Sequence, residues 1–557
     1  MTESNQDMAN NFFAKKSVEE LIAQTEEGEH KLKRALGSFD LILLGIGAII
    51  GTGIFVLTGV GAALHAGPAV TLSFGVSAIA CVFAALCYAE FASIIPVSGS
   101  AYTYAYATIG ELLAWIIGWD LILEYAVCSI TVAIGWSGYL VNLLAGMGII
   151  IPVWMCTPPF NLPALIIVAI ITTLLVIGIK ESAKFNNVIV LVKLAVILFF
   201  IVLGLFFIRP ENWSPFMPYG WTGVMTGAAI VFFAYIGFDA VSTTAEETKN
   251  PQRDLPIGII VSLLVCSTLY IIVALVLTGI IPVMDYADNQ SFLSAPIAFA
   301  LNVIHQDWAS GIISVGAVMG ITSVLLVMMM GQPRVFFAMS RDRLFPENIS
   351  KVHPRFRTPY RTTIITGIAV GLVALLIPIG TAAELANIGT LFAFAIVSGS
   401  VLILRRTNPA IKRSFRVPLV WVISPLGVVF SFYLMYSLPV LTWLRFLAWL
   451  DIGLLIYYFY GRTHSRISDK VHRDKTFKWK DMLEFFGIFA LVNGILFGLL
   501  SVLAITGATS LKSWDEISFE PHHSLIVCII LIAAGTVVFL AGRINNRNGN
   551  GRQQVSR

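Results

Sequence analysis

The sequence predicts an all-α integral membrane protein with about fourteen transmembrane helices, and three observations support this fold class. Of its 557 residues, 57% are hydrophobic and only 12% are charged, and the mean hydropathy is +0.84. Soluble domains carry about 25% charged residues, so the composition excludes a soluble enzyme, a disulfide-rich secreted domain and a disordered chain. The other two observations are the long apolar stretches and the placement of the basic residues.

Apolar stretches that are long enough to cross a bilayer, about 20 residues each, recur from Phe39 to Leu540. The two closely spaced pairs, within residues 362–404 and 418–460, are the hardest to divide. The chain opens with a polar stretch, so no cleavable signal peptide is expected. Hydropathy places the fourteen span centres near residues 50, 82, 122, 170, 198, 234, 269, 320, 370, 394, 427, 452, 495 and 532.

The basic residues support this count, because cytoplasmic loops of membrane proteins hold most of the Lys and Arg. With the N-terminus inside, 32 of the 36 fall in predicted inside segments, whereas Arg209, Arg445 and Lys512 fall outside and Lys193 lies within a span. One missed or additional helix would invert every later loop. We therefore expect a multi-pass protein of the cell membrane with both termini in the cytoplasm, and no nucleic-acid partner, since the net charge is only +4.

These predictions divide the chain into seven segments. The first, residues 1–35, is a cytoplasmic segment with a short amphipathic helix, in which Ser17 and Glu20 have the spacing of a capping box. The others are spans 1–5, spans 6–10, spans 11–12, a basic cytoplasmic linker, an extra pair of spans and a cytoplasmic tail: 36–210, 211–405, 406–462, 463–481, 482–542 and 543–557.

The cysteine, histidine and nucleophilic residues argue against an enzyme. The six cysteines are scattered and show neither a metal spacing nor a disulfide pattern. The eight histidines fall mainly in tails and loops, and no nucleophile constellation accompanies them. An ion channel would need a charged ring or a carbonyl filter, and neither is visible. We therefore expect no catalytic activity, no metal and no cofactor.

The first span carries four glycines in nine residues, among them Gly47 and Gly51. Close helix packing explains such a small-xxx-small pair on its own. However, the run Gly51, Thr52 and Gly53 lowers helix propensity at mid-depth, and unwound backbone is tolerated there only where it lines a cavity or is buried in protein. A helix break between Ile49 and Gly53 is therefore expected.

The sixth span is interrupted in the same way. Gly237, Asp239, Ser242, Thr243 and Thr244 follow one another within an apolar run. The sixth span comes five spans after the first, so the two spans cross the membrane in opposite directions. Two such segments in corresponding positions indicate an inverted-repeat transporter with its site at the midplane. Half-helix amide groups can hold a carboxylate and freed carbonyls can hold an ammonium group, which suits an amino-acid zwitterion.

Lys193 lies inside the fifth span, only about six residues beyond Asn187. Snorkelling to the interface is the alternative interpretation. Burial disfavours the ammonium form of a lysine, whereas contact with free carbonyls favours it. A group balanced in this way can gain and lose a proton during a transport cycle, so we predict proton coupling through Lys193.

Other polar residues and one methionine within the spans are further candidates. Asp120 and Glu124 stand four apart on one helix face. Glu124 lies deeper in the membrane and is, with Lys193, a candidate for proton coupling. Asp120, Asp239 and Glu90 are candidates for gating or structural roles. Met328 in the eighth span borders the site or is core filler, two roles that methionine fills equally well.

At this point the motifs resemble those of the amino acid–polyamine–organocation superfamily, and in particular the bacterial members of its cationic amino acid transporter family. The likeness covers roughly residues 35–462. Each motif alone would be a weak signal. Together they are specific: LGSFD at 36–40, GIGAIIGTGIF at 45–55, YAEF at 88–91, PVSGSAY at 96–102, WDLILEY at 119–125 and FDAVSTTAEE at 238–247.

The resemblance implies a five-plus-five inverted repeat like that of the leucine transporter, with broken helices 1 and 6 and with proton rather than sodium coupling. It implies that the substrate carboxylate meets the first-span residues Ile49, Gly51, Thr52 and Gly53. It also implies that Lys193 occupies the region where sodium-coupled relatives hold a cation and bridges to the broken first span.

The remaining site residues follow from the same resemblance. Phe233 and Ile236 would meet or cover the substrate ammonium group, and Glu124 would face the pocket from the third span. Met328 would border the side-chain pocket, where its bulk favours small neutral side chains over arginine or lysine. The departure from bacterial relatives is the extra pair at 482–542, which resembles animal members and is expected to have a packing, lipid or partner role.

The leading prediction is therefore proton-coupled import of small neutral L-amino acids such as alanine by alternating access. Uptake or exchange of cationic amino acids is the alternative, which Glu124 supports and Met328 opposes. A sensor that binds an amino acid without cycling is an alternative of a different class. The sequence leaves open any lipid or sterol ligand, any small membrane-protein partner and the oligomeric state.

Overall fold

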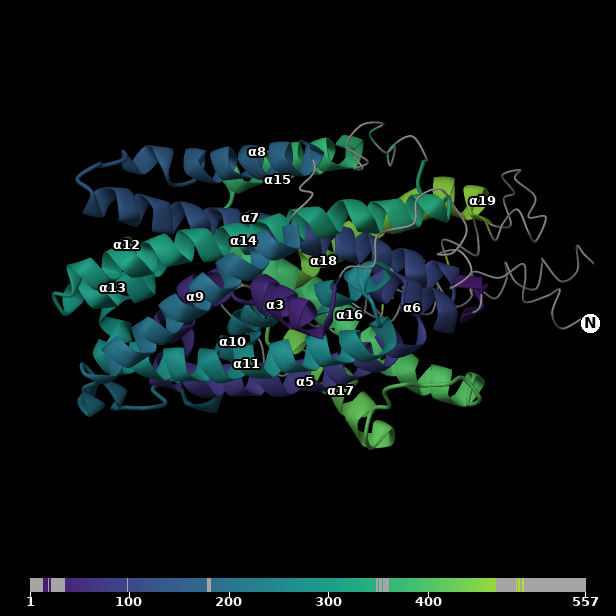
Figure 1. The fold of residues 1–557 in the computed structure, drawn as a ribbon, viewed down its shortest axis with the longest axis horizontal. Coiled ribbons are helices and arrows are strands. Elements are labelled where there is room, and N and C mark those ends of the chain that lie inside the picture. The colour runs from purple at the N-terminus through teal and green to yellow at the C-terminus, as the bar shows by residue number, and fades with distance from the viewer. Residues whose placement is uncertain are drawn as a thin grey trace, which may run out of the picture. The chain divides into compact units, whose positions relative to one another are not determined.

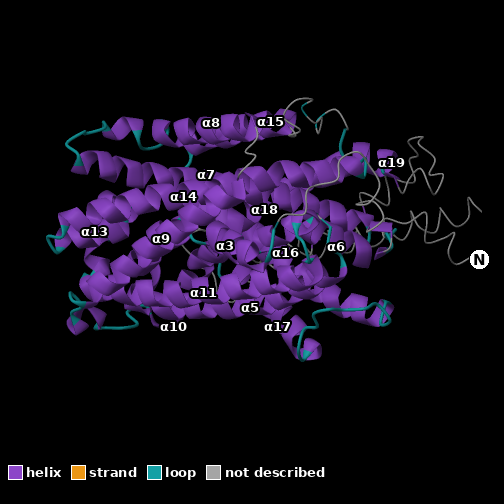
Figure 2. Ribbon diagram, viewed as in Figure 1, coloured by secondary structure: helices purple, strands orange, loops and turns teal. Residues whose placement is uncertain are grey.

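The structure is a computed structural model of the chain. It describes residues 14–18, 20–21, 36–97, 99–177, 182–346, 349, 353, 360–466, 487, 489–490 and 493–494. Within these residues every named element is a helix, and the only β pairing is an isolated bridge between Leu36 and Thr248 (Figure 2). The all-α prediction is thus confirmed, whereas the predicted spans near 495 and 532 lie outside the described residues.

The chain forms two compact units. The main unit consists of Phe12–Arg341 and Pro346–Met435, and the small unit consists of Asp342–Phe345, Tyr436–Arg557 and Met1–Asn11. In the small unit the described helices are α18 (Val440–Ile456), a π-helical turn (Tyr457–Gly461) and α19 (Arg462–His464). All of the predicted site residues belong to the main unit.

The described helices have the length and hydropathy of membrane spans, which makes the chain a multi-pass membrane protein. Eight regions are long and apolar enough to cross a bilayer, and four further apolar helices are shorter. Each of the first twelve predicted centres lies within a helix or at a break in one. Besides the broken spans, the main-unit helices are α5 (Val70–Ile94), α7 (Glu111–Gly146), α8 (Leu162–Ile177), α9 (Ser182–Leu205), α11 (Pro251–Ile280), α14 (Asp307–Arg341), α15 (Tyr360–Leu376), α16 (Ile379–Thr407) and α17 (Val420–Tyr436).

The first and sixth spans are broken, as the sequence predicts. Helix α3 (Ser38–Ile49) ends where Ile50 turns extended, and a π-helical turn (Gly53–Leu57) and α4 (Thr58–Gly61) continue the span. In the sixth span, α10 (Gly220–Val231) runs into a 3₁₀ turn, η6 (Phe232–Tyr235).

The sixth span then leaves helical geometry at Ile236 and Gly237. Ile236 is extended and Gly237 has φ +122°, a value that favours glycine because it has no Cβ. A second 3₁₀ segment, η7 (Asp239–Glu247), completes the span.

The helices of the main unit pack into an inner group around the two breaks and an outer pair. Helix α3 contacts α9 and α11, α5 contacts α10 and α11, and α14 contacts α7 and α9 (Figure 1). Helices α8 and α15 contact each other along one edge of this unit. They expose apolar side chains such as Ile166, Ile170, Ile365 and Ile368, which is expected of helices that face lipid.

Short helices form connections that hydropathy did not predict. They are α6 (Ser100–Thr108), α12 (Gln290–Ser294) and α13 (Pro296–Val303). All are shorter than the roughly 20 residues needed to span a bilayer, so a search for long apolar stretches does not detect them. Near the start of the chain, Ser17 Oγ accepts a hydrogen bond of 3.0 Å from the backbone N–H of Glu20, and Val18 and Leu21 are buried.

Candidate functional site

The breaks in spans 1 and 6 touch each other, and glycines make this contact possible. A Cβ added to Gly53 would overlap the Cα of Ala234. A Cβ added to Gly237 would lie 2.9 Å from the carbonyl oxygen of Ala48. The glycines therefore allow two unwound segments to cross at backbone contact in the middle of the main unit, which is the arrangement that inverted-repeat transporters use to build a midplane site.

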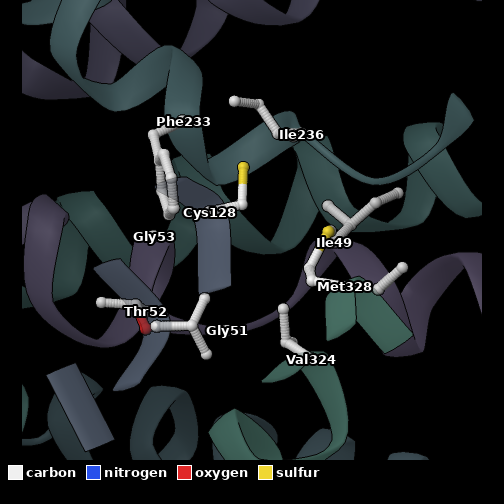
Figure 3. A pocket seen from close by; sticks show the side chains of 11 residues that line it. Ile49, Gly51, Thr52, Gly53, Cys128, Phe233, Ile236, Val324 and Met328 are labelled. Atoms are coloured by element: carbon white, nitrogen blue, oxygen red, sulfur yellow. The ribbon is translucent and has the colours of Figure 1, made fainter. Parts of the chain in front are cut away.

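A small buried cavity lies at this crossing. Its volume is about 10 Å³, which is room for about one water molecule. Figure 3 shows Phe233 and Ile236 on one side of it and Gly51 and Val324 on the opposite side. The described residues that line it are Ala48, Ile49, Gly51, Thr52, Gly53, Cys128, Val132, Phe233, Ile236, Val324 and Met328.

Seven of the eight predicted substrate-binding residues line this cavity. They come from both broken spans and from α14. Glu124 is the exception, because Cys128, one turn further along α7, lines the cavity and Glu124 does not. The structure thus brings Ile49, Gly51, Thr52, Gly53, Phe233, Ile236 and Met328 together, and their contact with a substrate stays a prediction.

Four lining residues were missed by the sequence analysis: Ala48, Cys128, Val132 and Val324. Helical spacing offers a signal for two of them. Val324 lies four residues before Met328, and Cys128 lies four residues after Glu124, so each shares a helix face with a predicted site residue. Ala48 and Val132 are small apolar residues in apolar runs, and nothing in the sequence distinguishes them.

Thr52 is the polar side chain of the cavity. Its hydroxyl is buried and has no hydrogen-bond partner among the described residues. Thr52 also stands where the second half of the first span begins, and the first N–H groups of a helix have no acceptor within it. A buried hydroxyl at the start of a half-helix can hydrogen-bond an anionic group such as a carboxylate, and such a contact at Thr52 stays a prediction.

Lys193 projects from α9 to the end of helix α3. Its Nζ donates hydrogen bonds to the carbonyl oxygens of Gly47 at 2.7 Å and Ile50 at 2.8 Å, and to Ser323 Oγ of α14 at 3.1 Å. The side chain is fully buried, so it does not snorkel to an interface. Lys193 therefore joins the broken span to two other helices, and Ser323 is a partner that the sequence analysis missed.

Tyr270 on α11 contacts both breaks, and the sequence analysis did not single it out. Its hydroxyl lies 2.8 Å from the carbonyl oxygen of Ile49 and 2.8 Å from that of Ala234. A phenol has one proton and can donate to one of these oxygens at a time. The available sequence signal for this contact was a single tyrosine, Tyr270, within an apolar run.

Three carboxylates of the third and sixth spans, those of Asp120, Glu124 and Asp239, are buried and do not line the cavity. Glu124 Oε1, Asp239 Oδ1 and both carboxylate oxygens of Asp120 have no hydrogen-bond partner among the described residues. The Tyr125 hydroxyl donates a long hydrogen bond of 3.4 Å to Asp239 Oδ2. Buried carboxylate oxygens without a partner need a bound water or a proton. A gating or structural role for Asp120 and Asp239 stays a prediction.

Glu90 lies at the end of α5, outside the lining of the cavity. Its buried carboxylate forms ion pairs with Arg405 at 2.6 Å and with Arg413 at 3.2 Å. Glu90 is therefore not exposed to water at the end of the span. Burial lowers the pKa of the Arg413 guanidinium from its ordinary value, and the nearby carboxylate of Glu90 opposes that effect.

Two touching helix breaks, a cavity at their crossing and a lysine on the broken span define a membrane transporter of the inverted-repeat type. Residues 36–445 match the family model described as amino acid permease. The chain belongs to this family, within the amino acid–polyamine–organocation superfamily, and the resemblance found in the sequence is confirmed.

Similar chains are transporters rather than enzymes. The branched-chain amino acid permease BcaP of Bacillus subtilis (strain 168) is 53% identical over 470 residues, which are 83% of this chain and 100% of the relative. The methylthioribose transporter of the same organism is 51% identical over 463 residues, 82% of this chain and 99% of the relative. The vacuolar cationic amino acid transporter 2 of Arabidopsis thaliana is 40% identical over 399 residues, 68% of this chain and 61% of the relative.

Proposed function

We propose that this protein imports neutral L-amino acids of small size together with protons, by alternating access across the cell membrane, with both termini in the cytoplasm. The observation that carries the proposal is the Lys193 contact. A buried ammonium group holds the carbonyl oxygens of Gly47 and Ile50 at the end of helix α3, beside the cavity.

The group that binds the carbonyl oxygens of Gly47 and Ile50 indicates which ion is coupled to transport. Freed carbonyl oxygens at the end of a half-helix hold Na⁺ or H⁺ in inverted-repeat transporters. Here the Lys193 ammonium already satisfies two of them, so a proton on Lys193 supplies the positive charge that a metal cation would bring. Loss of that proton leaves a neutral amine with one hydrogen fewer to donate, which weakens the link between α9 and the broken span.

The substrate class follows from the lining. No charged side chain is among the described residues that line the cavity, and an unpaired cation in such a site would be costly. Met328, Val324 and Ile236 present apolar groups to the cavity, which suits a short apolar side chain. The similarity to a branched-chain amino acid permease supports a neutral substrate as well.

Cationic amino acids are the second candidate. Glu124 is buried one turn from Cys128, and one of its oxygens has no partner among the described residues. A turn of this side chain toward the cavity would place a carboxylate against a cationic side chain. The names of the plant relatives add weight to this candidate.

The test is uptake by the purified protein in liposomes, with an inward proton gradient and without sodium. Labelled alanine, valine, arginine and methylthioribose are compared with and without a protonophore. We expect concentrative uptake of alanine and valine that the protonophore abolishes. Preferential uptake of arginine would select the second candidate, and accumulation that is indifferent to the protonophore would contradict proton coupling. Binding without any uptake would indicate a sensor.

A further inference from the structure

A second constellation of buried charges lies outside the cavity, around Glu90 at the end of α5. Its side chain is only 2% exposed. The carboxylate accepts two hydrogen bonds from Arg405, from Nε at 2.8 Å and Nη2 at 2.6 Å, and one from Arg413 Nε at 3.2 Å. The backbone N–H of Val417 donates a fourth at 2.7 Å. A bidentate arginine fork is among the strongest charge-assisted contacts in proteins.

The segment between α16 and α17 is built around this carboxylate. Arg413 is itself buried, with a side chain 3% exposed, and its remaining N–H groups hold the turn that follows α16. The carbonyl oxygens that accept from it are those of Leu404, Asn408, Pro409 and Ile411, at 2.9 to 3.4 Å. Glu90 is therefore the shared acceptor that fastens this whole segment to α5.

The two helices joined in this way touch each other but have different main neighbours. Helix α5 packs most extensively on α11 and α10, next to both broken spans, whereas α16 packs most extensively on α7 and less on α5. Movement of the broken spans against α7 would carry α5 away from α16 at this end. The ion pairs of Glu90 oppose such a separation.

We propose that Glu90, Arg405 and Arg413 form a clamp that closes one side of the membrane and opens during the transport cycle. The inference rests on the alternating access of the proposed function, in which one group of helices rocks against another. In the closed state the charges satisfy one another, and removal of one partner leaves a buried charge unpaired. In the open state water reaches all three groups. The basic residues around the clamp place it on the predicted cytoplasmic side.

Cys128 offers a direct readout of this opening. It lines the cavity, so a membrane-impermeant thiol reagent reaches it only from a side that is open. The experiment uses the full-length protein in liposomes with the other five cysteines replaced by alanine, and applies the reagent from each side. Neither a substrate nor a proton gradient is needed, so an error in the proposed substrate or coupling ion leaves the result interpretable.

Glu90→Gln is expected to raise the rate of Cys128 labelling from the clamp side about tenfold, within the range of ordinary conformational couplings, without a rise from the other side. Arg406→Gln is the matched control. Arg406 is the next residue of α16, but it is exposed and lies 5.2 Å from the Trp421 ring. Its variant should label at the wild-type rate.

Labelling of Glu90→Gln at the wild-type rate from both sides, in protein with a near-native melting temperature, would overturn the clamp and leave a static anchor. If this variant does not fold, Arg405→Lys takes its place, because lysine keeps the charge but loses the bidentate fork. It is expected to raise labelling from the clamp side about threefold, less than full removal of the pair. An unchanged rate in that variant would overturn the proposal equally.

Discussion

The Nζ atom of Lys193 lies 2.8 Å from the carbonyl oxygen of Ile50, the extended residue that follows helix α3. This contact ties α9 to the point where the first span unwinds. The same ammonium group reaches Ser323 on α14. The Lys193 side chain therefore links three segments around the cavity. Its protonation state determines how many N–H donors it has, and hence how many of these acceptors it can bond at once.

The first prediction concerns coupling. Lys193→Ala should abolish accumulation of a neutral amino acid against its gradient, because no ammonium group remains to bind and release the proton. Exchange of labelled for unlabelled substrate should persist at about a tenth of the wild-type rate or more, since no cavity-lining side chain is removed. The measurement is uptake and counterflow in the same liposome preparation.

Ser323→Ala is the control for this variant. It removes one of three acceptors of the lysine while the two carbonyl contacts remain. Accumulation should be retained at reduced rate. Unimpaired accumulation in Lys193→Ala at an imposed pH gradient would remove Lys193 from the coupling mechanism.

The two helix breaks are the features of the site that could be predicted best from the sequence. The interruptions at Gly51–Gly53 and at Gly237 were predictable because glycine and polar residues in the middle of a span conflict with helix propensity and with lipid. Lys193 was predictable for the same reason. Glycine, polar and charged residues stand out in an apolar span, so they can be recognised from the neighbouring sequence alone.

Contacts across the fold were not predictable in this way. Cys128 and Val324 look like ordinary core residues, and only their position opposite the breaks makes them part of the lining. Glu90 and Arg413 are 323 residues apart, and their ion pair depends on which helices pack together. The position of Glu124 behind Cys128 rather than in the cavity also depends on how α7 is rotated, which hydropathy does not determine.

A second prediction concerns substrate size. Met328→Ser should admit larger neutral side chains, since it shortens a side chain that lines the cavity. We expect inhibition of alanine uptake by leucine or phenylalanine to strengthen about tenfold, which corresponds to the one to three kcal/mol that a methylene or two contributes in an apolar pocket. Competition assays with a panel of unlabelled amino acids provide the measurement.

Met330→Ser serves as the comparison, because Met330 is half-buried on the same helix and does not line the cavity. Its competition profile should match that of the wild type. An identical profile in both variants would show that Met328 is packing rather than a determinant of specificity.

A third prediction concerns the substrate carboxylate. Thr52→Val keeps the shape of the side chain and removes the buried hydroxyl, which has no partner among the described residues. The KM should rise about tenfold, since a hydrogen bond to a charged group contributes about 1.5 to 3 kcal/mol, and folding should be little affected. Thr58→Val is the control, because its hydroxyl bonds the Ile54 carbonyl at 2.8 Å within the same half-helix. A KM change of equal size in both variants would argue against a substrate contact at Thr52.

The last prediction tests whether the crossing of the two breaks is required for transport. Gly53→Ala places a methyl group where the backbone of Ala234 already lies, and backbone cannot yield as a flexible side chain can. The two spans must then separate, at a cost of about 1 to 3 kcal/mol typical of overpacking. We expect loss of uptake and a lower melting temperature. Gly75→Ala on α5 is the matched control, since an added Cβ there meets nothing within 4 Å, and it should transport normally. Normal uptake by Gly53→Ala would show that the breaks need not touch, and would weaken every assignment that depends on the cavity between them.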